Sequence, residues 1–343
     1  MLLVRPLNFT DIQGLERLAV ISGGSMTTLP ANRDHLGELI NSTQQSLRKA
    51  VEHPGSESYH FVLEDTDSGE ILGVSGIDAA VGISTPFYSY RIEEVVHASS
   101  ELQIHNRVPA LHLCQDYTGA ARLCTLFLDS AHRSQNNLHL LSRARMLLIA
   151  QFPERFAPRL IVELQGVADE EHRSPFWECL GRHFFNMDFT KANYLTGINN
   201  KGFIADLMPH YPVYVPLLTP EAQAALGKPR PDMEEVMALL ENEGFNYRGY
   251  VDIFDAGPTL EARTDNVRSV RQNQQTVARI GESSDEAALR PALISNTSLE
   301  NYRCLMTRID PAQPVISAEQ ANLLQVEEGG DIRLLLLEEA ELG

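Results

Sequence analysis

Arg133 and Asn136 occupy a short polar segment whose position suits the binding of an anion. The segment follows an almost unbroken apolar run from Leu123 to Leu128, which predicts a buried strand. A helix with apolar residues at helical spacing is predicted from Leu138 onward. A strand that leads through a tight loop into a helix directs several backbone N–H groups and the positive end of the helix dipole at one place. Phosphates bind at such places, so we predict a phosphate-binding turn here.

The predicted turn departs from the usual composition of such sites, because it contains no glycine. Glycine would let the backbone approach a phosphate closely and adopt positive φ. Asn136 tolerates left-handed φ and is therefore a partial substitute. A polyanionic ligand would also need local positive charge, which Arg133, Arg143 and Arg145 are in the right segment to supply.

General acid–base chemistry has four candidate residues. Glu163 lies in the apolar run 159–168, which predicts a second buried strand. A carboxylate on an interior strand is unfavourable unless it is paired or functional, so Glu163 is a candidate base. His97, His105 and His112 are the other candidates, although a lone histidine is more often a structural or surface residue.

The elements that would position these residues begin with a strand over residues 2–7. Two amphipathic helices follow, the first from Asp11 and the second over residues 36–51. Two apolar runs around the turn 66–69 then predict a hairpin.

The chain changes character past residue 258. Residues 263–291 are polar, and apolar runs at 290–296, 301–310 and 331–339 predict further strands. We therefore predict an α/β (α+β) protein with a mixed sheet flanked by helices. Its domains are predicted to be a large domain over residues 1–258 and a small β-rich, barrel-like domain over residues 259–343.

The composition excludes several classes of partner. The net charge of −18 disfavours nucleic acid and anionic membranes, and it favours a cationic ligand. No apolar run approaches the roughly 18 residues of a membrane span, and the N-terminus has no secretory signal. The four cysteines are scattered, which predicts free thiols in the cytoplasm and no metal site.

Longer strings of residues resemble the arginine N-succinyltransferase family, whose fold is that of the GNAT-like acyl-CoA N-acyltransferases. The resembling strings keep the expected order along the chain. They are residues 4–6, 27–32, 61–82, 86–91, 96–99, 123–129, 174–189, 203–218 and 252–262.

The resemblance implies that the chain transfers a succinyl group from succinyl-CoA to the α-amine of L-arginine, in arginine catabolism. The reaction needs a base for the ammonium and N–H donors for the oxyanion, but no metal and no covalent enzyme intermediate. The implied acyl-CoA contacts are the main chain of Leu126, with its neighbours Phe127 and Leu128, and the turn residues Arg133 and Asn136. The resemblance also implies that the strands at 123–128 and 159–168 are parallel neighbours that splay apart and form a notch for the donor.

The histidine that serves the family as acid–base residue corresponds here to Arg230, in the string 227–231. An arginine stays charged at any usable pH and does not shuttle protons near neutrality. The catalytic role is therefore not transferred to this position. Glu163, as base or as arginine ligand, and His97, which lies in a matching string, are the candidates that remain.

Three functions are consistent with these departures. The chain is an active succinyltransferase with another base, or a degenerate subunit of a hetero-oligomeric arginine/ornithine succinyltransferase whose related partner holds the intact site. In either case we expect a homo- or hetero-oligomer with a related subunit. In the third case it binds arginine or acyl-CoA without turnover. Turnover by the isolated chain, turnover only after mixing with a related subunit, and binding alone distinguish the three.

Asp252 and Asp255 could pair with a guanidinium, but their position before Gly257 favours a turn.

Overall fold

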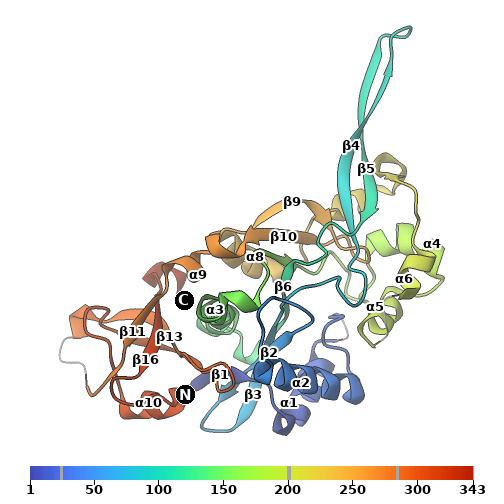
Figure 1. The fold of residues 1–343 in the computed structure, drawn as a ribbon. Coiled ribbons are helices and arrows are strands. Elements are labelled where there is room, and N and C mark those ends of the chain that lie inside the picture. The colour runs from blue at the N-terminus through green and yellow to red at the C-terminus, as the bar shows by residue number, and fades with distance from the viewer. Residues whose placement is uncertain (24–25, 199–201, 283–285, 343) are drawn as a thin grey trace.

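One large mixed sheet runs through the protein (Figure 1). The computed structural model describes residues 1–23, 26–198, 202–282 and 286–342, and fourteen strands within these residues form the sheet. The strand order is β11-β16-β13-β14-β1-β2-β3-β6-β7-β10-β9-β4-β5-β8. The bounds are β1 Leu2–Pro6, β2 Ser58–Asp65, β3 Glu70–Asp78, β4 Ser89–Ser99, β5 Ile104–Cys114, β6 Ala121–Leu128, β7 Arg159–Glu163, β8 Val213–Tyr214, β9 Asn246–Val251, β10 Pro258–Arg263, β11 Gln274–Val277, β13 Arg290–Asn296, β14 Cys304–Ile309 and β16 Asp331–Leu336, while β12 Arg279–Ile280 and β15 Val315–Ile316 pair separately.

Helices cover both faces of the sheet, as the mixed α/β prediction requires. Phe61 and Leu63 on β2 pack in the cluster that contains α3, whereas Val62 between them packs in the cluster of α1 and α2. Because side chains alternate along a strand, these helices lie on opposite faces. The helices are α1 Ile12–Ile21, α2 Arg33–Arg48, α3 Gln135–Gln151, α4 Arg182–Phe185, α5 Phe189–Ile198, α6 Gly202–Leu207, α7 Pro220–Ala225, α8 Glu234–Asn242, α9 Arg268–Gln272 and α10 Ala318–Leu324.

Strands β6 and β7 form the only parallel pair of the sheet within the described residues. Their pairing is short: it joins Ala121 to Leu160 and ends where Leu123 faces Val162. Beyond that point β6 continues beside β3 alone. The splayed parallel strands expected from the sequence are therefore present.

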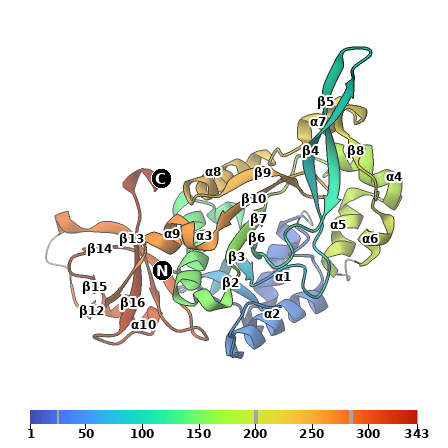
Figure 2. The same ribbon diagram turned by 45° about the horizontal axis from the view of Figure 1, so that its top comes forward.

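Strands β4 and β5 form a long hairpin that projects from the body (Figures 1 and 2). β4 pairs with β9 only at Tyr90 and Arg91, and β5 pairs with β8 only at Ala110 and Leu111. The outer part of the hairpin is thus a two-stranded ribbon. It carries His97, which is exposed and whose ring centroid lies 5.5 Å from that of Tyr214.

The C-terminal strands β11, β13, β14 and β16 occupy the end of the sheet opposite the hairpin (Figure 1). They are joined to the rest through the pairing of β14 with β1. β10, which the sequence assigned to the C-terminal domain, instead pairs with β7 and β9 in the middle of the sheet. The division at residues 258 and 259 stays a prediction.

Candidate active site

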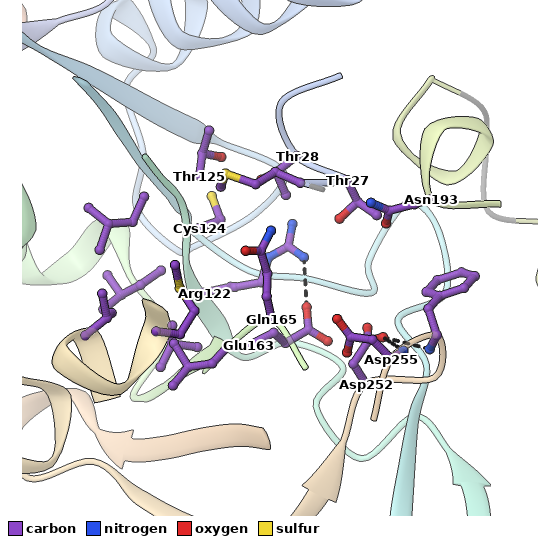
Figure 3. A pocket seen from close by; sticks show the side chains of 18 of the residues that line it. Thr27, Thr28, Arg122, Cys124, Thr125, Glu163, Gln165, Asn193, Asp252 and Asp255 are labelled. Atoms are coloured by element: carbon purple, nitrogen blue, oxygen red, sulfur yellow. Dashed lines mark hydrogen bonds and ion pairs between the residues drawn. The ribbon is translucent and has the colours of Figure 1, made fainter. Parts of the chain in front are cut away.

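A cavity opens where β6 and β7 part, and we call it the notch cavity. Since the pairing ends at Leu123 and Val162, the backbone groups of the following β6 residues that face β7 have no ladder partner in that strand. Figure 3 shows side chains from β6, β7 and the 252–255 segment around the space. The lining residues are Met26, Thr27, Thr28, Arg122, Leu123, Cys124, Thr125, Leu126, Arg145, Val162, Glu163, Leu164, Gln165, Phe189, Asn193, Met233, Val236, Leu240, Asp252, Phe254 and Asp255.

A β-bulge in β6 bends this strand at the notch. Its register with β3 shifts between the pairs Gly76–Cys124 and Val74–Phe127. Thr125, inside the bulge, has φ of +55°, which is rare for a β-branched residue. The bulge adds one residue to β6 and changes the direction of the backbone groups at Leu126.

A second cavity, the mouth cavity, adjoins the notch cavity through shared lining residues such as Leu126, Gln165 and Met233. It is lined by four of the predicted acyl-CoA contacts, namely Leu126, Phe127, Leu128 and Arg133. Arg230 and Asp232 also line it. The mouth cavity therefore combines an apolar wall with two arginines and one carboxylate.

The two arginines of the mouth cavity are held by the start of the α8 region. Arg133 donates to the backbone carbonyl of Asp232 at 2.8 Å, and Arg230 pairs with the carboxylate of Asp232. The backbone N–H of Arg230 donates to the carbonyl of Gln165 at 2.8 Å, which fixes Arg230 beside the extension of β7. Helix α3 begins nearby at Gln135, capped by Ser134.

Arg122 connects two carboxylates at the base of the notch cavity. It contacts Asp78 at 2.7 Å and Glu163 at 3.3 Å. Glu163 is the last residue of β7, and its side chain is half-buried and extends into the cavity beside Arg122 (Figure 3). The prediction that a carboxylate on this strand must be paired or functional is thus met by an ion pair.

Asp252 and Asp255 stand across from Glu163 in Figure 3. Asp252 accepts hydrogen bonds from the backbone N–H groups of Phe254 and Asp255, which is the turn predicted from the sequence. Asp255 accepts from Gly166 and Gly257, each at 2.8 Å. Burial raises the pKa of Asp255, the charge of Asp252 raises it further, and the two backbone donors oppose this rise. Both residues also line the notch cavity, so the turn forms part of the cavity wall.

The structure does not bring the histidine candidates to the notch. His97 and His105 are exposed on the projecting hairpin, and His112 lies on β5 with its Nε2 3.8 Å from Glu93. None of the three lines the notch or mouth cavity as the described residues define them. His97 lies in a matching string, but β4 carries it onto the projecting hairpin, and its role as the base stays a prediction.

Two residues of the predicted anion-binding segment direct their side chains away from the two cavities. Asn136 lies in the first turn of α3, but it lines a separate hollow beside Leu2 and Leu305. Arg143 is 1% exposed and pairs with Glu243 and Glu341. The rotation of α3 sets both orientations, and a contact between the main chain of Asn136 and the donor stays a prediction.

The sequence did not single out Arg122, which precedes the predicted strand run by one residue. The signal in the sequence was an arginine next to Leu123, at the start of a buried strand. An arginine in that position needs an acidic partner. It also missed His60, a buried histidine whose Nε2 lies 3.2 Å from the hydroxyl of Thr125. Burial lowers the pKa of His60 to about 4, so its imidazole is neutral at physiological pH.

Known proteins are similar to this chain over most or all of its length. A model of the arginine N-succinyltransferase beta subunit family matches residues 2–269. The chain belongs to the arginine N-succinyltransferase family. Within this family, an arginine N-succinyltransferase subunit beta of Pseudomonas aeruginosa is 44% identical over the full length of both chains. An arginine N-succinyltransferase of an Enterobacter species is 41% identical over 98% of each chain.

A solved structure of the same family has the same fold. It is the arginine/ornithine succinyltransferase subunit AI from Pseudomonas aeruginosa, which superposes with a TM-score of 0.91 at 39% identity and covers 99% of both chains. In the described part of this chain, histidine, cysteine and acidic residues form no group that could hold a metal ion. The described helices include none with the length and hydropathy needed to cross a membrane.

Proposed function

We propose that this chain transfers the succinyl group of succinyl-CoA to the α-amine of L-arginine. The observation that carries the proposal is the union of two features in one cavity: an unpaired edge of β6 at the notch, and the carboxylates of Glu163, Asp252 and Asp255 across from it. The acyl thioester needs the unpaired edge of β6, and a cationic acceptor needs the carboxylates. The relatives named above support the reaction, and we place it in the cytoplasm, as the scattered cysteines predict.

The donor would enter through the mouth cavity. Its diphosphate would lie near Arg133, Arg230 and the first N–H groups of α3, where the helix dipole favours negative charge. The pantetheine arm would pass along β6 between Leu126 and Met233, which line both cavities. The thioester carbonyl would then lie at the unpaired β6 edge, whose N–H groups can stabilise an oxyanion.

The acceptor would occupy the acidic side of the notch cavity. Glu163 would take a proton from the α-ammonium, and the amine nitrogen would then attack the thioester carbon to form a tetrahedral intermediate. When the intermediate collapses, the C–S bond breaks and the second proton of the nitrogen passes to the leaving thiolate, giving the amide and the free thiol of CoA. Asp252 and Asp255 would hold the guanidinium. We choose Glu163 as the base over His97 because Glu163 lies at the end of β7, where the notch begins.

The direct test is turnover by the isolated chain with succinyl-CoA, followed by thiol release and by the mass of the acylated product. Arginine and ornithine should serve as acceptors. Citrulline has nearly the shape of arginine but no side-chain charge. Its KM should be at least about tenfold higher than that of arginine, because it loses a charge-assisted contact. Equal KM values for citrulline and arginine would contradict the role given to the acidic side. Arg230→His is the companion variant, since a gain in turnover would assign the base to position 230 and not to Glu163.

A second candidate function is that of one subunit in an assembly with a related chain. It is favoured because relatives from Pseudomonas aeruginosa are named as subunits, beta and AI, and because Arg230 occupies the position of the family histidine. In that case the isolated chain would bind CoA but turn over only after a related subunit is added. Size measurement of the chain alone and of the mixture would accompany the assay.

A further inference from the structure

Arg145 is an unusual charge for a protein interior. It is 2% exposed, and within the described residues its guanidinium has no carboxylate at ion-pair distance. Desolvation by burial lowers its pKa to about 10, so it remains charged at neutral pH. A buried charge without a counter-ion is unfavourable unless its hydrogen bonds are satisfied and serve a purpose.

The hydrogen bonds of Arg145 converge on the β-bulge of β6. One terminal nitrogen donates to the carbonyl of Gly76 at 3.2 Å and to the carbonyl of Cys124 at 3.3 Å. Gly76 and Cys124 face each other in the last pair before the register shift. Arg145 therefore joins β3 to β6 at the point where the regular ladder is interrupted.

The remaining hydrogen bonds of Arg145 fix its own position. Its Nε donates to the carbonyl of Ser142 and its other terminal nitrogen to the hydroxyl of Ser142, each at 3.1 Å. Both partners belong to the same helix, α3, so the side chain is held rigidly against the sheet. Arg145 also lines the notch cavity.

The opposite face of the bulge is held by His60. Its Nε2 contacts the hydroxyl of Thr125, and a Cβ added at Gly76 would lie 2.5 Å from that nitrogen. Only glycine at this position lets the imidazole reach across β3. The positive φ of Thr125 is thus maintained by buried polar groups on both faces, as a strained conformation requires.

We infer that Arg145 is a positioning residue for the acyl donor: it holds the bulge of β6 so that the backbone beyond Thr125 faces the thioester. This inference rests on the proposed function. It assigns no direct contact with the reacting atoms to Arg145. The bulge would relax toward a regular strand without it, and the N–H groups of the notch edge would turn away from the donor.

Arg145→Lys tests this role, because lysine keeps the charge but cannot donate to both strands and to Ser142 at once. Arg143→Lys is the matched control, since Arg143 is equally buried on the same helix but contacts Glu243 and Glu341 and not the bulge. Calorimetric titration with succinyl-CoA, in the absence of arginine, should show a dissociation constant raised at least tenfold for Arg145→Lys and less than twofold for Arg143→Lys. Steady-state kinetics should show KM for succinyl-CoA raised in parallel.

Thr125→Gly supplies a second arm, since glycine adopts positive φ without strain. In this background Arg145→Lys should weaken succinyl-CoA binding less than threefold, and the double variant serves if the single variant cannot be purified. An equal loss in both backgrounds, or unchanged binding by Arg145→Lys, would overturn the positioning role. Failure of the parent chain to bind succinyl-CoA would instead overturn the proposed function, and this inference with it.

Discussion

Arg122 determines how charge is balanced at the base of the notch. It binds Asp78 through two nitrogens, at 3.0 and 2.7 Å, and reaches Glu163 through a third at 3.3 Å. The two-point contact with Asp78 fixes the guanidinium plane. Glu163 is therefore oriented by a group that is itself anchored, and its carboxylate stays directed into the cavity.

Glu163→Gln should lower kcat for arginine succinylation by about 10²–10⁴, because the amide has similar size but cannot accept the proton. KM for succinyl-CoA should change little, since the donor lies on the β6 side. Steady-state kinetics with both substrates provide the measurement. Glu261→Gln is the control: Glu261 is also a strand glutamate paired with an arginine, Arg159, but on β10 outside the cavities. A kcat within twofold of the parent would remove Glu163 from the mechanism.

Arg230→Met should raise KM for succinyl-CoA about tenfold with little effect on kcat, because a charge-assisted contact to a phosphate is lost in the ground and transition states alike. Arg263→Met, which removes an exposed arginine paired with Asp265, should leave both parameters unchanged. A fall in kcat without a change in KM would indicate that Arg230 acts on the reacting atoms.

At the scale of elements, the acidic wall of the notch depends on two segments whose backbones nearly touch. A Cβ at Gly257 would lie 2.1 Å from the carbonyl oxygen of Leu164, and one at Gly166 would lie 2.4 Å from that of Asp255. Neither clash can be relieved by a side-chain rotation, because the contacted atoms belong to the backbone. The β7 extension and the 252–257 turn can therefore approach only through glycine.

Gly257→Ala should accordingly lower the free energy of unfolding by about 1–3 kcal/mol, as overpacking does, and should also weaken arginine binding, because the turn that carries Asp252 and Asp255 must shift. Gly37→Ala is the control, since a Cβ there meets nothing within 4 Å on α2. It should stabilise the protein by about 0.4–1 kcal/mol. Urea unfolding of both variants provides the comparison, and equal stability of Gly257→Ala and the parent would contradict the steric argument.

At the scale of the whole molecule, a buried ion network ties the C-terminal segment to the body. Glu341 accepts from Arg143 on α3 at 2.8 Å and from Arg268 on α9 at 2.7 Å, and Arg143 also pairs with Glu243 after α8. Partial burial alone would raise the pKa of Glu341, but the two arginines outweigh it and lower the pKa to about 2. The charged form of Glu341 is therefore stabilised in the folded protein.

Because the folded pKa of Glu341 lies below its ordinary value of 4.5, its contribution to stability is full above pH 4.5 and disappears as the pH falls toward about 2. Glu341→Gln should lower the free energy of unfolding by about 2–4 kcal/mol at pH 7, because the buried Arg143 loses a partner. The difference from the parent should shrink between pH 4.5 and pH 2. Glu339→Gln, which removes an exposed pair with Arg308, should have little effect at any pH. A pH-independent difference for Glu341→Gln would show that the loss is one of packing.

Local patterns in the sequence were enough to predict the strand–loop–helix unit, the opening strands and helices and the apolar C-terminal strands. Each depends on side-chain periodicity within one segment, and the structure has β6, α3, β13, β14 and β16 where these patterns lie. The family followed from long strings of residues and is confirmed by the comparisons.

The tertiary structure alone decided which polar residues meet. Glu163, Asp252 and Arg122 come from three strands or turns that are distant in sequence, and only the end of the β6–β7 pairing brings them to one cavity. The same holds for His97, which a matching string made a candidate and the projecting hairpin carries away from the notch. The periodicity of a sequence shows which side of a strand or helix is buried. The residues that this side contacts depend on the order of the strands in the sheet and on the rotation of the helices. No single segment of the sequence contains that information.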